Sequence, residues 1–159
     1  MMGETAGKIR IITKKAEETR VLAGILAREC LKVPLRKEAL VIGLEGELGA
    51  GKTCFVKGFA ERLGVKETIT SPTFVLLKIF KLSRKKFKRL IHIDAYRINS
   101  VKELKALGWE KFLKDPQNII IIEWTDKARG ILPKNYLQAK FEHFKENERK
   151  IIFSARGKK

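Results

Sequence analysis

A glycine-rich segment of eight residues constrains the fold of this chain more than any other part of the sequence. Residues 46–53 read GELGAGKT, which matches the phosphate-loop pattern G-x-x-x-x-G-K-[ST]. An apolar run, ALVIGLEG over 39–46, precedes it, and a helical pattern that stops at Gly64 follows. Glycines let such a loop close around an anion, while amides at the start of the helix face that anion. The sequence therefore predicts a strand, a phosphate-binding loop and a helix, in that order.

The residue types in this loop predict how it holds a nucleotide. We expect Lys52 to reach the β- and γ-phosphates, and Thr53 to supply a hydroxyl to Mg²⁺. Cys54 has no base beside it in the local sequence, so we interpret it as a small buried side chain and not as a nucleophile. The predicted nucleotide-binding residues are Gly46, Glu47, Leu48, Gly49, Ala50, Gly51, Lys52, Thr53 and Cys54.

The rest of the chain predicts an α/β fold of the P-loop NTPase type. Strands alternate with helices in the first half and hairpins follow, which indicates a mainly parallel sheet flanked by helices, with added antiparallel strands. Further helices are expected over 16–32 and 100–108, and further strands over 8–14, 71–80, 89–96, 118–124, 136–144 and 149–155. No linker divides the 159 residues, so we expect one domain over 1–159 with a basic tail at 156–159.

Two acidic residues stand at the ends of apolar strands. Asp94 follows LIHI over 90–93, and Glu123 follows IIII over 119–122. Ligands of open α/β sheets bind at the carboxyl ends of parallel strands, so both acids are expected to face the phosphate loop. Phosphoryl transfer needs such a carboxylate near magnesium. From the residues alone, each acid has the alternative of a helix cap or a surface charge. His92 is expected to be a half-buried strand residue and not a metal ligand.

Other polar and aromatic residues adjoin these segments. Thr73, in SPTF over 71–74, follows the predicted helix where a switch-like segment would approach the γ-phosphate; an ordinary turn at the start of a strand is the alternative. Tyr96, Arg97 and Trp124 adjoin the two acids and are candidates for contact with phosphate or a partner, with core packing as the alternative.

The charge of the chain favours anionic partners. Lysines and arginines number 35 against 18 acids, a formal net charge of +17. Such a charge attracts RNA, phosphates or acidic proteins, although a lysine-rich proteome explains it equally well. Five cations within 84–89 predict either a solvated hairpin tip or a surface that steers the chain toward tRNA or an acidic partner. No apolar run reaches the length of a membrane span and cysteines number only 2, so we expect a soluble, cytoplasmic protein without a membrane partner.

Four motifs occur in an order and spacing that resemble one family. GELGAGKT is followed by SPTF, HIDAYR over 92–97 and IEW over 122–124. The chain resembles, over about residues 10–155, the TsaE (formerly YjeE) family of bacterial P-loop ATPases needed for threonylcarbamoyladenosine (t6A) modification of tRNA, at adenosine 37 of ANN-decoding tRNAs. The resemblance implies that Lys52 and the 49–53 backbone hold ATP and that Thr53 and Glu123 hold Mg²⁺. It also implies that Asp94 serves hydrolysis.

The same resemblance implies further residues and partners. Ser71, Pro72 and Thr73 match the family's switch-like segment, and residues 12–19 match a segment near the adenine. Activity is implied to be weak in isolation and to depend on the TsaB and TsaD proteins, with tRNA contacted through their complex. The rival interpretation is a small-molecule P-loop kinase, which would need an acceptor pocket and an arginine-bearing lid. A GTPase is disfavoured because the chain has no N-K-x-D motif.

Overall fold

One mixed β-sheet organises the computed structural model of this protein, which describes residues 7–70 and 76–157. The strands are β1 (Ile9–Thr13), β2 (Leu40–Gly46), β3 (Leu77–Lys81), β4 (Arg89–Asp94), β5 (Asn118–Glu123), β6 (Tyr136–His143) and β7 (Arg149–Arg156). Their order across the sheet is β1-β7-β6-β2-β5-β4-β3. The four central strands, β6, β2, β5 and β4, are parallel to one another, whereas β1, β7 and β3 join antiparallel. The predicted α/β fold with a parallel centre and antiparallel additions is confirmed.

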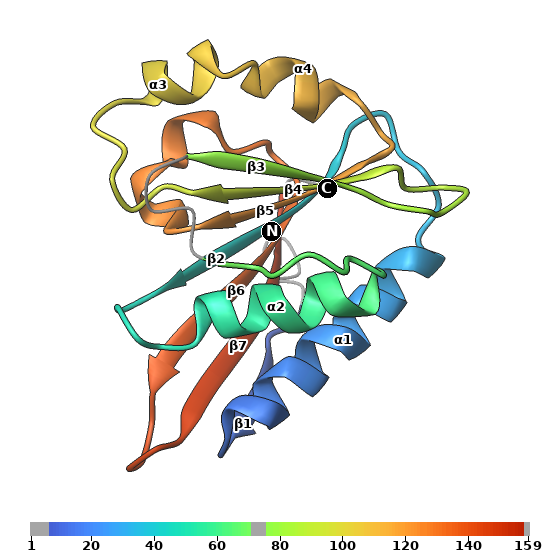
Figure 1. Ribbon diagram of the computed structural model, residues 1–159. Coiled ribbons are helices and arrows are strands. Elements are labelled where there is room, and N and C mark those ends of the chain that lie inside the picture. The colour runs from blue at the N-terminus through green and yellow to red at the C-terminus, as the bar shows by residue number, and fades with distance from the viewer. Residues whose placement is uncertain (1–6, 71–75, 158–159) are drawn as a thin grey trace, which may run out of the picture.

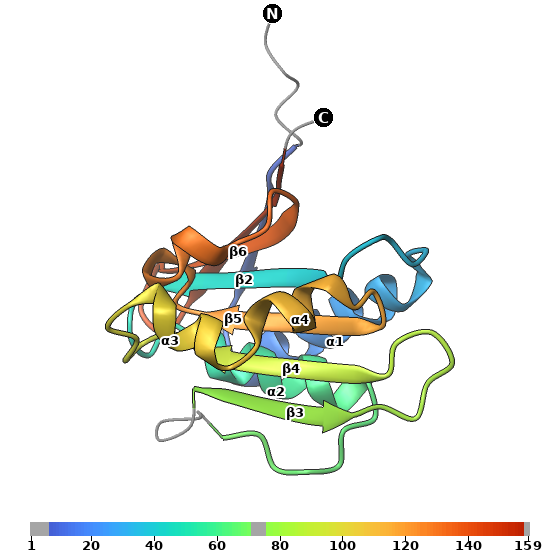
Figure 2. The same cartoon turned by 90° about the horizontal axis from the view of Figure 1, so that it is seen from above.

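Helices cover both faces of the sheet. They are α1 (Ala16–Lys32), α2 (Lys52–Arg62), α3 (Val101–Ala106) and α4 (Trp109–Lys114), with 3₁₀ turns η1 (Thr125–Lys127) and η2 (Arg129–Ile131). Figure 1 shows α1 and α2 on one face and α3 and α4 on the other. Figure 2, seen from above, shows α3 and α4 lying over the β4 and β5 side of the sheet, with β3 at its edge.

One helical prediction was incomplete. The helix expected over 100–108 ends earlier, because Gly108 adopts a φ of 89° that breaks the helical path. A second short helix, α4, starts at the next residue and was not predicted. Its first residue, Trp109, is buried and its indole nitrogen donates a hydrogen bond of 2.9 Å to the carbonyl of Ile131. That contact attaches α4 to the segment that follows β5.

Alternation along β4 and β5 divides the core into two layers. Leu90, Ile119 and Ile121 pack in the layer beneath α1 and α2. Ile91 and Ile93 pack in the opposite layer, beneath α3 and α4, as do Ile120 and Ile122. Successive side chains of a strand point to opposite faces, so every second residue of these strands faces the helix that follows the phosphate loop. This alternation also decides the direction of the acids that end the two strands.

The basic segment between β3 and β4 is held against helix ends. The guanidinium of Arg84 donates to the carbonyls of Arg62, at 3.0 Å, and Leu63, at the end of α2. The ammonium of Lys86 donates to the carbonyl of Val33, which follows α1. Cations stabilise the carbonyl end of a helix by interacting with its last unpaired acceptors. Arg84 is exposed, as a solvated hairpin tip predicts, but it and the partly buried Lys86 also donate to helix ends, which that interpretation did not include.

None of the helices in the described part of the chain is long and apolar enough to cross a membrane.

Candidate functional site

The phosphate loop connects β2 to α2 at the edge of the sheet where β2, β4 and β5 all end (Figure 1). Its three glycines adopt positive φ angles, 153° at Gly46, 78° at Gly49 and 106° at Gly51, the residue before α2. A side chain at Gly46 would also place its Cβ 2.6 Å from the carbonyl oxygen of Phe141 on β6. Only glycine combines this backbone freedom with this close approach. The loop therefore has the strand–loop–helix context that the sequence predicted.

Lys52 is folded back onto its own loop. Its ammonium donates hydrogen bonds of 2.6 Å to the carbonyl of Gly46 and 2.8 Å to that of Glu47. Burial lowers the pKa of Lys52 from its ordinary value, while the carboxylates of Glu123 and Asp94 oppose that shift. The two bonds use two of the three N–H donors of the ammonium. Lys52 thus presents a buried positive charge at the loop, where phosphate groups are expected.

Glu123 and Asp94 lie side by side, because they are partners in the parallel register of β5 and β4. Both are buried. The hydroxyl of Thr53 donates a hydrogen bond of 2.9 Å to Oε1 of Glu123. Oδ1 of Asp94 accepts a bond of 2.9 Å from the backbone N–H of Tyr96, so Asp94 orders the turn that follows its strand. The structure brings both predicted acids to the phosphate loop, and Glu123 is the acid in contact with Thr53.

Trp124 follows Glu123 in an unusual backbone conformation. Its φ of 62° and ψ of 50° are left-handed values that bulky residues rarely adopt. The indole ring lies 4.8 Å from the ring of Tyr96, at 45° to it. The ammonium of Lys127 donates to the carbonyl of Tyr96 at 2.7 Å and lies 5.9 Å from the indole. Backbone strain of this kind concentrates at functional sites, where the surrounding contacts maintain it.

These groups surround a cavity of about 370 Å³. That volume falls in the range of small-ligand sites. Its lining residues are Leu48, Gly49, Gly51, Lys52, Thr53, Cys54, Leu76, Asp94, Tyr96, Arg97, Glu123 and Trp124. Arg97 is exposed at this cavity. The predicted residues Ser71, Pro72 and Thr73 lie outside the described residues, while Leu76 does line the cavity.

Cys54 is only partly buried, so its interpretation as a buried side chain was incomplete. Its thiol donates to the carbonyl of Ala16 at 3.4 Å, which places the start of α1 beside the cavity. Burial raises the pKa of the thiol above its ordinary value, against the effect of Arg20 and Lys57. A protonated thiol is a poor nucleophile, which agrees with the sequence interpretation.

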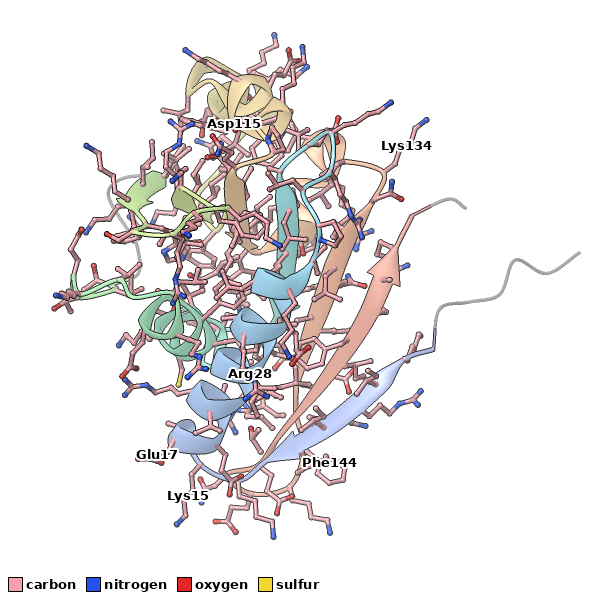
Figure 3. The ribbon with its side chains drawn as sticks, turned by 90° about the vertical axis from the view of Figure 1, so that its right-hand side faces the viewer. Lys15, Glu17, Arg28, Asp115, Lys134 and Phe144 are labelled. Atoms are coloured by element: carbon pink, nitrogen blue, oxygen red, sulfur yellow. The ribbon has the colours of Figure 1, made fainter. Side chains whose placement is uncertain are left out.

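The segment 12–19 lies at the same end of the molecule as the β6–β7 turn. Figure 3 shows Lys15 and Glu17, at the start of α1, near the end where Phe144 lies. The hydroxyls of Thr13 and Thr19 form a buried hydrogen bond of 2.8 Å, which joins the end of β1 to the first turn of α1. This bond holds the two ends of the segment together.

Two contacts of the site were not predicted from the sequence. Nε2 of His92 lies 2.6 Å from Oε2 of Glu123, and His92 is fully buried, so the expectation of a half-buried strand residue was wrong. The guanidinium of Arg149, on β7, donates to the carbonyl of Gly49 at 3.3 Å. The only signal for His92 in the sequence was its place two residues before Asp94, on the same face of β4. Arg149 had no local signal.

The donor set fits a nucleotide with magnesium. Mg²⁺ is usually held by one or two protein oxygens together with phosphate oxygens and water, so a hydroxyl and one carboxylate suffice. Thr53 and Glu123 supply such a pair beside the ammonium of Lys52. Within residues 7–70 and 76–157, no group of three or more His, Cys, Asp or Glu side chains is arranged to hold a metal ion.

The sequence of this chain is similar to those of known proteins. The family model for the threonylcarbamoyl adenosine biosynthesis protein TsaE matches residues 13–151. The tRNA threonylcarbamoyladenosine biosynthesis protein TsaE of Bacillus subtilis (strain 168) is 35% identical over 145 residues, covering 91% of this chain and 84% of that protein. The protein of the same name from Treponema pallidum (strain Nichols) is 34% identical over 128 residues, covering 79% and 85%.

A solved structure extends the similarity to three dimensions. The crystal structure of YdiB from Bacillus subtilis superimposes with a TM-score of 0.75 at 30% sequence identity, covering 98% of this chain and 90% of that one. The family match spans the phosphate loop, both buried acids and Trp124. The chain therefore belongs to the TsaE family.

Proposed function

We propose that this chain binds ATP with Mg²⁺ in the cavity beside the phosphate loop and hydrolyses it in the biosynthesis of threonylcarbamoyladenosine in tRNA. The observation that carries the proposal is the hydrogen bond between Thr53 and Glu123, which forms next to the buried ammonium of Lys52. These three groups are the ones that a P-loop site uses to hold a metal-bound triphosphate. Family membership supports the tRNA modification as the process served.

Each group has a distinct proposed role. The amides of residues 49–53 and Lys52 hold the phosphates, whose charge they offset. Thr53 and Glu123 hold Mg²⁺, which when bound neutralises charge on the phosphate oxygens. Asp94 orients the attacking water. Ser71, Pro72 and Thr73 act as a switch-like segment near the γ-phosphate, and Tyr96, Arg97 and Trp124 contact phosphate or a partner at the mouth of the cavity.

Hydrolysis is proposed to depend on partner proteins. We infer that the TsaB and TsaD proteins are these partners, that the chain alone is a weak ATPase, and that tRNA is reached through the complex in the cytoplasm. The name of the family supports a shared pathway. The excess of cations supports contact with acidic or phosphate-rich surfaces, since a net charge of +17 attracts such partners over long range.

A small-molecule kinase is less well supported. It would need an arginine-bearing lid after β5, and the described chain there forms two 3₁₀ turns and a hairpin. Arg156 in this region donates to Oε1 of Gln138 at 2.8 Å, and Arg129 faces Glu45 at 3.8 Å. Neither contact points to an acceptor-binding lid.

Calorimetric ATP titration with Mg²⁺ and with EDTA tests the proposal. The parent protein is expected to bind ATP more tightly with Mg²⁺, and Lys52→Ala to weaken binding by roughly 10- to 100-fold, the effect of losing about 1.5–3 kcal/mol from one charged hydrogen bond. Lys57→Ala, an exposed lysine of the same helix, is the matched control and should bind like the parent. Hydrolysis should rise when TsaB and TsaD are added. Equal ATP affinity in the parent and Lys52→Ala would contradict the proposal.

A further inference from the structure

One histidine is buried directly behind the acid of the metal site. Nε2 of His92 lies 2.6 Å from Oε2 of Glu123, and the two side chains are only 1% and 2% exposed. The residues are 31 apart in the chain and meet because His92 and Glu123 lie on the same face of the adjacent strands β4 and β5. That face points toward α2, on which Thr53 lies.

The carboxylate of Glu123 is thereby held at both oxygens. Oε1 accepts from the hydroxyl of Thr53 at 2.9 Å, and Oε2 faces the imidazole. A carboxylate only accepts hydrogen bonds, so Nε2 of His92 must carry a proton to bond with it. With one bond a carboxylate can rotate about its Cγ–Cδ axis, whereas two bonds on different oxygens fix its plane. The bond from the imidazole to Oε2 therefore leaves Oε1 of Glu123 as the oxygen that faces the phosphate loop.

The other ring nitrogen argues against a role in packing alone. Nδ1 of His92 is buried and has no hydrogen-bond partner among the described residues. Burying a polar atom without a partner destabilises a fold, so an apolar side chain would suit this interior position better if filling space were the only need. The N–H at Nε2 is the feature of this ring that an apolar side chain cannot supply.

We propose that His92 is a positioning residue that holds Oε2 of Glu123, so that Oε1 stays directed at Thr53, where the two side chains would hold the metal. This inference rests on the proposed binding of ATP with Mg²⁺. It makes His92 a partner of the metal ligand and not a ligand itself, since its donor nitrogen is engaged by the carboxylate. Such outer partners of a ligand commonly change metal affinity by about 10- to 100-fold when removed.

Magnesium titrations at fixed ATP test the proposal. His92→Leu is expected to raise the Mg²⁺ concentration needed for half-maximal ATP binding by about tenfold or more, with ATP affinity in EDTA unchanged. His92→Gln should recover most of the parent value, because its amide nitrogen reaches a similar position to Nε2. Ile91→Val is the matched control: it removes a methyl group from the same strand but on the opposite face, away from Glu123.

The outcomes separate this proposal from the one on which it rests. A parent protein that binds ATP equally with and without Mg²⁺ would contradict the proposed function. A parent that responds to Mg²⁺, with His92→Leu responding identically, would overturn the role of His92. So would an equal shift in Ile91→Val, because it would show a general loosening of β4.

A second measurement does not depend on the metal. The chain has 2 histidines, so ¹⁵N-histidine spectra of the parent and of His143→Gln assign the ring of His92. The metal-free protein should show the tautomer with the proton on Nε2. A proton on Nδ1 alone would overturn the proposal, since Nε2 would then have nothing to donate to Glu123.

Discussion

The ammonium of Lys52 lies 3.9 Å from the centre of the indole ring of Trp124. A cation over an indole face is attracted by its π electrons, with about 0.5–2 kcal/mol of stabilisation. The contact joins the lysine of the phosphate loop to the residue that follows the proposed metal ligand. A change at Lys52 therefore alters the surroundings of Trp124.

The emission of Trp124 should report nucleotide binding. ATP with Mg²⁺ is expected to produce a saturable change in tryptophan fluorescence, because phosphates would draw Lys52 into new contacts. The chain has 2 tryptophans, and the other, Trp109, is buried in the core layer beneath α3 and α4 and does not line the cavity. Trp109→Phe should keep the signal and Trp124→Phe should lose it. A signal that survives in Trp124→Phe would show that Lys52 does not couple to this ring.

Substitution should separate the two buried acids. Glu123→Ala removes the partner of Thr53 and is expected to weaken Mg²⁺-dependent ATP binding. Asp94→Ala should keep binding and lose turnover by about 10²–10⁴-fold, the usual effect of removing one positioning or base group. Titration with Mg²⁺ or EDTA, followed by single-turnover hydrolysis, distinguishes the two phenotypes.

Asp126→Ala supplies the control for that pair, because Asp126 is acidic and acts on the charge of Lys52 but is exposed. It should retain both binding and turnover. The opposite pattern, with binding lost in Asp94→Ala and kept in Glu123→Ala, would reverse the two roles and strengthen the kinase alternative.

The packing of α1 on α2 should be disrupted by an alanine at Gly58 but should tolerate an alanine at Gly24. A Cβ at Gly58 would lie 2.3 Å from the carbonyl oxygen of Arg20, so Gly58→Ala forces the helices apart. The expected loss is about 1–3 kcal/mol of unfolding free energy. Each kcal/mol of lost unfolding free energy should lower Tm by roughly 2–4 °C.

Gly24→Ala is the matched substitution on α1, because the new Cβ would meet Cβ of Arg62 at an ordinary 3.7 Å. It should stabilise the helix by about 0.5–1 kcal/mol, since glycine is the more flexible residue in the unfolded chain. Thermal unfolding of both variants checks the pair. Equal changes in Tm would show that the close approach at Gly58 does not limit the packing.

Alkylation should distinguish the two cysteines. Burial raises the pKa of Cys30 to about 12; it also raises the pKa of Cys54, which is less buried. The thiolate is the reactive form, so both rates should increase about tenfold per pH unit below the pKa, with Cys54 the faster. ATP with Mg²⁺ should slow Cys54 and leave Cys30 unchanged, because only Cys54 lines the cavity. Peptide mass spectrometry measures both rates; equal rates for Cys54 with and without ATP would contradict its place at the nucleotide.

Patterns within single segments of the sequence predicted those parts of the site that come from one continuous stretch of the chain. The phosphate loop is a contiguous motif, and Asp94 and Glu123 were found because each ends an apolar strand. Their proximity followed from a general rule of parallel sheets, and the register of β4 and β5 agrees with it. The helix over 16–32 was predicted with its observed bounds because its apolar spacing extends over several turns.

Contacts between distant segments could not be predicted in this way. The bond from His92 to Glu123 requires the register of two strands, and the contact of Arg149 with Gly49 requires the β6–β7 hairpin to lie beside the loop. The six residues of α4 are too few for a helical period to be distinguished. A count of charges also gave no indication that Arg84 and Lys86 are directed at helix ends.

The attachment of the β3–β4 loop to α1 and α2 has a consequence for protein engineering. Tolerance to insertion depends on the backbone contacts that are interrupted, not on whether a segment is a loop. Displacing Arg84 and Lys86 would leave the ends of both helices without these donors, so a tag or new terminus at 84–86 should destabilise the fold. The turn at Glu146 and Asn147 is exposed and is a better place to open the chain.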